Sequence, residues 1–166
     1  IQKGGGGAPQ RSGGPRSGGP RVFKKTEVKE IDEKEIQNKI VAEAREKAKT
    51  YSGDPVLFLG GNWHPGVVGI AASKLSEEFW KPTWLFQIKE DSAKGSARSI
   101  PGFDVTEAMS SVGHLFTKFG GHRAAGGFSF SASNETEIRK QLNLYAENVR
   151  LKSPNLWESG VFYDCP

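Results

Sequence analysis

Hydrophobic residues recur every three or four positions between residues 32 and 49, and this spacing predicts a helix there. Asp32 and Glu35 form a capping-box pattern at its start. The apolar stripe is narrow and the remaining positions are charged, which favours a helix that connects or flanks domains over one at the centre of a core. The stripe consists of Ile36, Ile40, Val41, Ala44 and Ala48.

Beyond Pro55 short apolar strands alternate with helices. The continuous apolar run 56–59, closed by two glycines, is typical of a buried parallel strand. The next predicted elements are a helix over 66–80 and strands over 83–88 and 93–99. They are followed by a helix that is capped by Asp104 and ends near Gly113, a strand over 127–131, and a helix that is capped by Ser133 or Asn134 and runs to about Arg150. This alternation predicts an α/β fold: a mixed, mainly parallel sheet flanked by helices.

Composition divides the 166 residues into four parts. Residues 1–25 are rich in Gly, Pro and Ser, repeat Arg-Ser-Gly-Gly-Pro in tandem, and predict a disordered basic segment. This segment is either a linker or an arm that touches nucleic-acid phosphates. The predicted parts that follow are a connecting helix over 26–52, a compact domain over 53–152, and a tail or the start of a further domain over 153–166.

The net charge of +4 arises from the first part of the chain. Residues 1–25 carry six basic side chains and no acidic one, so the predicted domain is close to neutral. A polyanion would therefore meet a local basic patch and not a global field. The single cysteine, Cys165, excludes a disulfide framework within the chain. With no long apolar run and no signal peptide, we expect a cytoplasmic protein without a membrane partner.

The first candidate site lies where the strand 56–59 gives way to the helix 66–80. A helix N-terminus at that point offers unpaired N–H groups to an anion. His64 could donate to a phosphate, and Trp63 could stack on a base. The alternative is structural: Trp63 covers the core and His64 caps a turn. The residues alone leave both interpretations open.

The second candidate site is the segment 94–99. Because side chains alternate along a strand, Ser96 and Arg98 share one face and Lys94 lies beside them. A hydroxyl group next to a planar guanidinium is suited to bind a phosphate. The alternative is an ordinary strand whose polar side chains face water.

The third candidate site is the glycine-rich segment 120–128. Gly120 and Gly121 open a predicted loop whose accessible N–H groups could bind an anion, and His122 and Arg123 project from it. The alternative is a structural glycine turn between a helix and a strand. No cysteine–histidine metal spacing and no Walker loop occurs in the sequence.

Together the three segments resemble one family. In order they are Trp-His-Pro-Gly-Val-Val-Gly-Ile, Gly-Ser-Ala-Arg-Ser-Ile-Pro-Gly-Phe-Asp and Phe-Gly-Gly-His-x-x-Ala-x-Gly-Phe. They resemble the DHH-associated domain of RecJ exonucleases, over residues 55 to about 150. The resemblance implies degradation of single-stranded DNA from the 5′ end by two-metal chemistry, with roles in DNA repair and recombination.

The resemblance also implies roles for individual residues. Ser96 and Arg98 would hold the terminal 5′ phosphate, and His122 would reach toward the scissile phosphate. The backbone at Gly120 and Gly121 would allow that close approach. The roles of Trp63 and His64 are less defined.

One feature of the family pattern is missing, because the sequence contains no Asp-His-His triplet. We therefore expect no metal bound by this chain and Mn²⁺ or Mg²⁺ in a partner DHH domain, in cis or in trans. The expected partners are single-stranded DNA and that domain, and the chain alone is expected to be inactive. Two other functions stay open: one half of a phosphodiesterase for oligonucleotides or cyclic dinucleotides, and a non-catalytic nucleic-acid-binding adaptor.

Overall fold

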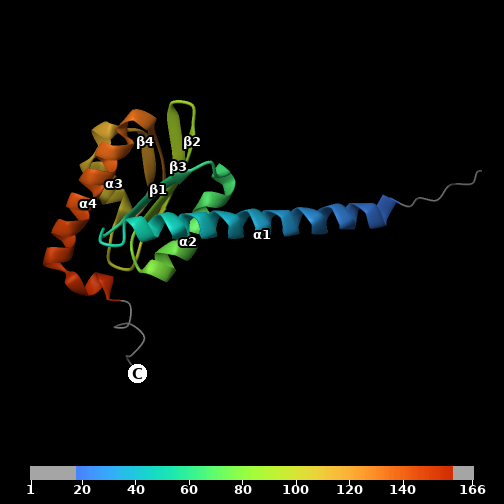
Figure 1. Cartoon of the computed structure of the whole chain (residues 1–166), viewed down its shortest axis with the longest axis horizontal. Helices are drawn as coiled ribbons and strands as arrows, with labels where there is room; N and C mark the ends of the chain where they lie inside the picture. The colour runs from blue at the N-terminus through green and yellow to red at the C-terminus, as the bar shows by residue number, and fades with distance from the viewer. Residues whose placement is uncertain (1–17, 159–166) are drawn as a thin grey trace, which may run out of the picture. The chain divides into compact units, whose positions relative to one another are not determined.

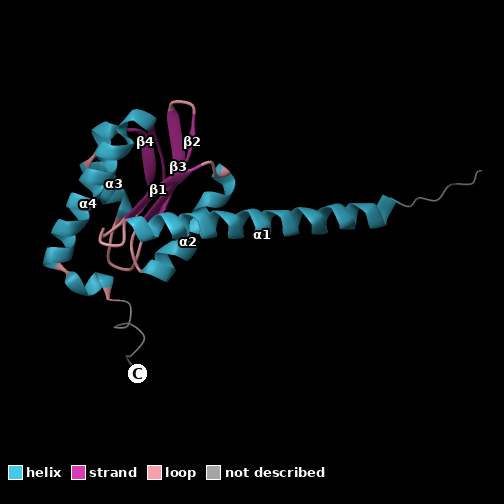
Figure 2. Cartoon of the chain, viewed as in Figure 1, coloured by secondary structure: helices cyan, strands magenta, loops and turns pink. Residues whose placement is uncertain are grey.

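The structure, a computed structural model, describes the backbone of residues 18–158 and the side chains of residues 33–158 (Figure 1). Its helices are α1 (Gly18–Thr50), α2 (Pro65–Phe79), α3 (Val105–Ser111) and α4 (Glu135–Lys152), with short 3-10 turns at Gly113–Leu115, Ala132–Asn134 and Pro154–Trp157. Its strands are β1 (Leu57–Gly61), β2 (Thr83–Lys89), β3 (Ser92–Arg98), β4 (Phe116–His122) and β5 (Ala125–Ser131). They form one sheet in the order β1-β2-β3-β5-β4 (Figure 2).

The predicted mixed sheet flanked by helices is confirmed. The expected predominance of parallel strands is wrong, because among the described strands β1–β2 is parallel while β2–β3, β3–β5 and β4–β5 are antiparallel. The crossover through α2 permits the parallel pair. Connections of two residues, at 90–91 and 123–124, allow only antiparallel hairpins.

The predicted glycine loop over 120–127 is also wrong, because these residues belong to the hairpin of β4 and β5. Glycine has a low strand propensity, so a strand that contains Gly120 and Gly121 has a weak sequence signal. The register pairs Gly120 with Gly127 and Gly121 with Gly126. The segment predicted to bind an anion through the N–H groups of a loop is therefore part of two paired β-strands.

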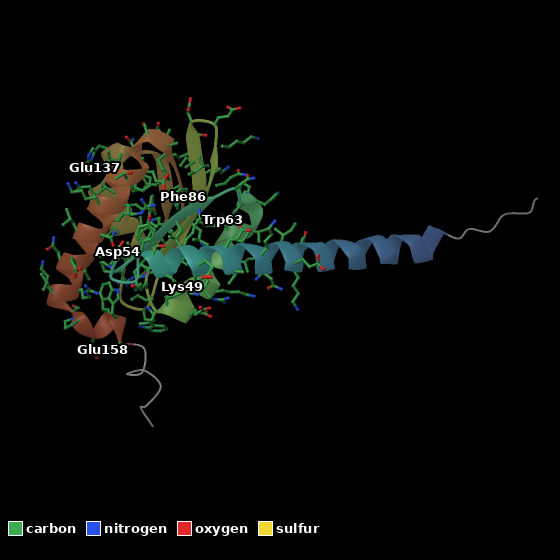
Figure 3. All side chains as sticks on the ribbon, viewed as in Figure 1. Lys49, Asp54, Trp63, Phe86, Glu137 and Glu158 are labelled. Atoms are coloured by element: carbon green, nitrogen blue, oxygen red, sulfur yellow. The ribbon has the colours of Figure 1, made fainter. Side chains whose placement is uncertain are left out.

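Two hydrophobic clusters lie on opposite faces of the sheet. On one face α3 and α4 cover a group of aromatic side chains, in which the ring centroids of Phe58 and Phe86 are 4.7 Å apart. Phe128 and Phe130 extend this group across the sheet. On the other face α1 and α2 cover the leucines of β1 and β2. Figure 3 shows Phe86 within the sheet and Trp63 near the start of α2.

Helix α1 begins at Gly18, earlier than the predicted residue 32, and so includes the last residues of the segment predicted to be disordered. Residues 22–34 lack glycine and proline and are rich in Lys and Glu, which favours a helix. The rest of the predicted disordered segment, residues 1–17, lies outside the described residues. Like the other described helices, α1 is not apolar enough to cross a membrane.

The second half of α1 packs into the core and does not merely flank the domain. Four of the five predicted stripe residues are buried: Ile40, Val41, Ala44 and Ala48. The fifth, Ile36, is 43% exposed. Lys47 donates to the carbonyl oxygen of Gly60, which ties the helix to the end of β1. Any connection to another domain stays a prediction.

Two isoleucines of α1, Ile40 and Ile36, give a matched test of this packing. Ile40→Ala is expected to lower the free energy of unfolding by about 2–4 kcal/mol, because it leaves a cavity in a close-packed cluster. Ile36→Ala is expected to change it by less than about 0.5 kcal/mol, because that side chain is largely exposed. Urea denaturation measures both, and equal effects of the two substitutions would contradict the packing of α1 described above.

Candidate anion-binding site

The sheet face that α1 and α2 cover is closed over β1 and β2, partly covered by α2 over β3, and open over β5 and β4. Leu57, Leu59 and Leu85 fill the closed half and are buried. Paired residues of neighbouring strands point to the same face, so the register defines the open half. It consists of a lysine row (Lys94, Ser129, Lys118), a glycine row (Ser96, Gly127, Gly120) and an arginine row (Arg98, Ala125, His122). These nine residues, all half-buried or exposed, are called the open face below.

Arg98 and Ser96 meet helix α2 at Gly69. A methyl group at Gly69 would lie 2.8 Å from Nη2 of Arg98 and 3.5 Å from Oγ of Ser96. The absence of a side chain at Gly69 therefore lets both groups lie against the helix. Arg98 donates from Nη1 to the carbonyl oxygen of Ala97 at 2.8 Å.

The guanidinium of Arg98 has no carboxylate partner among the described residues. Burial removes water from a cation, and no described carboxylate lies within ion-pair distance of Arg98 to compensate for that loss. An anion that accepts hydrogen bonds from the guanidinium would relieve this cost. Arg98 and Ser96 together thus form a site suited to a phosphate or carboxylate.

At the other end of the arginine row, hydrogen bonds to backbone carbonyl groups hold His122 and the turn that follows it. Three successive carbonyl oxygens, those of residues 122–124, accept hydrogen bonds from Thr106 Oγ1 at 2.8 Å, Val105 N at 3.0 Å and Ser99 N at 2.9 Å. The His122 ring accepts at Nδ1 from the N–H of Ala124 at 3.3 Å. A neutral ring in this position carries its proton on Nε2, so Nε2 is available as a donor. Arg123 lies in the turn, outside the three rows.

The glycines of the hairpin are of two kinds. Gly121 has φ +139°, and a methyl group there would lie 2.4 Å from the carbonyl oxygen of Ala125. Gly126 faces the same way, and a methyl group there would be 2.7 Å from the oxygen of Gly120. Glycine is therefore required at both positions, because any side chain there would clash with backbone atoms of the neighbouring strand.

Gly120 and Gly127 face the opposite way, onto the open face. A methyl group at Gly120 would meet nothing within 4 Å, and one at Gly127 would make only an ordinary contact at 3.8 Å. Packing does not require glycine at either position. Glycine inside a strand weakens it and often marks a place where a ligand approaches the backbone.

A shallow groove of about 500 Å³ runs over the lysine and glycine rows. Its walls and floor include Lys94, Ser96, Lys118, Gly120, Gly127 and Ser129. Arg98 lies at the edge of a second cavity of about 420 Å³ beside the end of α2. The structure thus brings the second and third predicted segments together on one surface.

The first predicted segment meets this surface at Gly69, but its Trp63 does not take the expected role. The Trp63 ring is 2% exposed, donates from Nε1 to Glu43 at 3.2 Å, and has Lys47 5.3 Å from its centroid. It has no free face on which a base could stack, so the stacking prediction is wrong and the structural alternative holds. His64 is the N-cap of α2 and accepts at Nδ1 from the N–H of Gly66. A phosphate contact by His64 stays a prediction.

Two residues of this surface, Lys118 and Ser129, were not predicted. The period-two spacing of residues 118, 120 and 122 would have placed Lys118 on the same face as His122 once β4 was recognised as a strand. Gly69 belongs to the motif Trp-His-Pro-Gly-Val-Val-Gly-Ile, but the sequence assigned it no contact with Ser96 and Arg98. Within the part of the chain that the structure describes, no group of three or more His, Cys, Asp or Glu side chains could hold a metal ion.

Comparison with known proteins defines the class of this domain. The model of the DHHA1 domain family matches residues 53–148, and the chain belongs to this family. Its DHHA1 domain is RecJ-like. The chain is 38% identical over 116 residues to the single-stranded-DNA-specific exonuclease RecJ of Bacillus subtilis, and the match covers 68% of this chain and 15% of that protein. To RecJ of Escherichia coli it is 36% identical over 110 residues, covering 63% and 18%.

Solved structures show the same fold. The crystal structure of RecJ from Thermus thermophilus in complex with Mn²⁺ superimposes with a TM-score of 0.63 at 23% identity, covering 71% of this chain and 17% of that one. A crystal structure of exonuclease RecJ bound to manganese has a TM-score of 0.59 at 22% identity, covering 77% and 31%. The chain thus spans less than a third of the length of the RecJ proteins that it matches here.

The two kinds of glycine can be separated by alanine substitution. Gly120→Ala is expected to leave the free energy of unfolding unchanged or to raise it by up to about 1 kcal/mol, because the unfolded chain loses entropy and nothing clashes. Gly121→Ala is expected to lower it by about 1–3 kcal/mol, because of its positive φ and the nearby carbonyl oxygen. Thermal or urea unfolding measures both. A large loss of stability with Gly120→Ala would show that this glycine is also structural.

Proposed function

We propose that this chain is the substrate-binding domain of a RecJ-like, metal-dependent exonuclease that degrades single-stranded DNA from 5′ to 3′. Family membership and the similarity to RecJ support the general class. The observation that carries the proposal is the half-buried guanidinium of Arg98, which lies beside the Ser96 hydroxyl with no carboxylate among the described residues to neutralise it. In this proposal the pair binds the 5′ phosphate of the strand.

A terminal phosphate suits this pair better than an internal one. It carries about 1.5 to 2 negative charges near neutral pH, because its second pKa is about 6. An internal phosphodiester carries a single charge. The planar guanidinium of Arg98 can donate two parallel hydrogen bonds, and the hydroxyl of Ser96 a third. Affinity for a 5′-phosphorylated end should therefore exceed affinity for a 5′-hydroxyl end.

His122 is the residue that we assign to the scissile phosphate. It lies two strands from Arg98 in the same row, which is about 10 Å at the usual spacing between strands. The first nucleotide would bridge the two residues, with its 5′ phosphate at Arg98 and its 3′ phosphate at His122. The His122 Nε2–H can donate to that phosphate, and the bare backbone at Gly120 lets the strand lie close to the sheet.

The divalent ions of the reaction belong to a second domain in this proposal. Solved RecJ structures contain Mn²⁺ or Mg²⁺. Such ions would activate water against the phosphodiester, and Asp and His residues of a DHH domain, in cis or in trans, would hold them. The part played by this chain is to bind the 5′ phosphate, to align the next phosphate, and to donate a hydrogen bond to it from His122.

The role of Arg98 can be tested by binding. Arg98→Ala is expected to weaken binding of a 5′-phosphorylated oligonucleotide about tenfold or more, and binding of its 5′-hydroxyl counterpart much less, because a charge-assisted contact is lost only where the terminal phosphate is present. Fluorescence anisotropy without divalent metal measures both affinities.

Arg150→Ala is the matched control, because Arg150 pairs with Glu147 on α4, the helix on the opposite face of the sheet. It should change neither affinity. Equal losses for the two oligonucleotides with Arg98→Ala would remove the terminal-phosphate role.

Reconstitution tests the proposed activity. The chain alone is expected to release no nucleotides from a 5′-phosphorylated single strand with Mn²⁺, whereas a mixture with a separately expressed DHH domain should degrade it. Activity of the mixture on dinucleotides but not on long strands would favour a phosphodiesterase of short oligonucleotides. Binding without activity in any mixture would favour a non-catalytic adaptor.

A further inference from the structure

The lysine row is the part of the open face to which the proposed contacts with the first nucleotide assign no role. Lys94 and Lys118 pair from either side with Ser129, and all three side chains line the same groove. Both lysines are exposed. In the part of the chain whose side chains the structure describes, neither lysine forms an ion pair or a hydrogen bond. Two unpaired cations thus flank one hydroxyl group.

The neighbours of this row offer no countercharge. Across β2 the residue that pairs with Lys94 is Gln87, which is neutral. The acidic residues closest in the chain, Glu90 and Asp91, lie in the turn between β2 and β3, outside the three rows. The two lysines lie on either side of Ser129, about 10 Å apart at the usual spacing between strands. An anion bound between them would be attracted by both ammonium groups.

The glycine row connects the lysine row to the proposed phosphate sites. Gly120 and Gly127 form a floor without side chains between the lysines and the arginine row, and that floor belongs to the same groove. Packing requires glycine at neither position. A strand of nucleic acid could therefore cross the sheet from one row to the other in contact with the backbone.

We propose that Lys94, Ser129 and Lys118 form a second phosphate subsite, which binds an internucleotide phosphate on the 3′ side of the scissile one. This inference rests on the proposed function, because it takes the 5′ phosphate to lie at Arg98. Lys118 is four residues from His122 along β4, about 14 Å at 3.4 Å per residue. The subsite thus lies beyond the reach of a single nucleotide bound at Arg98 and within the reach of a longer strand.

The subsite would hold the strand after each cleavage. When the first nucleotide leaves, the contacts at the arginine row are lost with it. Contacts at the lysine row involve phosphates that stay on the remaining strand. The same strand can then advance by one nucleotide without leaving the sheet.

Chain length separates this subsite from the terminal one. The affinities of dTMP, 5′-phosphorylated dithymidylate and 5′-phosphorylated tetrathymidylate are measured by calorimetry without divalent metal, for the unaltered chain and for the double variant Lys94→Gln/Lys118→Gln. We expect the double variant to bind the tetranucleotide about tenfold more weakly and dTMP less than twofold more weakly. The slope of log affinity against log salt for the tetranucleotide should fall in magnitude by about 1 to 2.

Two further variants complete the test. Lys140→Gln/Lys152→Gln removes two lysines of α4, on the opposite face of the sheet, and should leave every affinity unchanged. Arg98→Ala should weaken binding of all three ligands, because each carries a 5′ phosphate. If Arg98→Ala has no effect while the lysine variant still weakens only the longest ligand, the proposed terminal-phosphate site fails and the lysine subsite stands.

Other results would overturn the subsite itself. Equal losses for dTMP and the tetranucleotide in the lysine variant would show a general effect of charge and no separate subsite. Unchanged affinity for all three ligands would show that the lysine row does not bind nucleic acid, and an acidic protein surface would then be the better candidate. Both lysines are exposed, so the unfolding midpoint of the variant should match that of the unaltered chain and should exclude misfolding as the cause.

Discussion

The candidate site depends above all on the antiparallel register of β3, β5 and β4. That register places Arg98, Ala125 and His122 in one row, although 24 residues separate Arg98 from His122 in the chain. A shift of one residue in either pairing would turn the affected side chains to the opposite face of the sheet. The aromatic cluster on that face resists such a shift, because Phe128 and Phe130 are buried only in the observed register. Packing on one face thus sets the chemistry on the other.

The sequence predicts a good part of this arrangement, and the reasons for its failures are physical. The shared face of Ser96 and Arg98 is predictable because side chains alternate along a strand, so residues two positions apart point the same way. The strand β4 was not predicted, because its glycines have low strand propensity and its pairing with β5 is a tertiary effect. Trp63 was misread because the residues that bury it, Glu43 and Lys47, lie on α1, 20 and 16 residues earlier in the chain. A single sequence does not show contacts of that kind.

If the proposed function holds, stability and binding compete in the hairpin of β4 and β5. Gly121 and Gly126 allow the two strands to pair, since side chains there would meet backbone atoms. Gly120 and Gly127 do not serve packing, and residues with a higher strand propensity would give the strands more stability. The DHHA1 domain therefore contains glycines that support its fold beside glycines that weaken it. That contrast supports the proposal that the backbone of this hairpin meets a ligand.

The position of β4 at the end of the strand order has one more consequence. Among the described strands only β5 pairs with it, so the outer backbone groups of β4 form a sheet edge that could recruit a strand from another molecule. Proteins often protect such edges with charged side chains, lysine above all. Lys118 is well placed for that purpose, since it is the charged residue near the middle of β4. One ammonium group would then serve both solubility and substrate binding, and its loss would favour self-association of the chain.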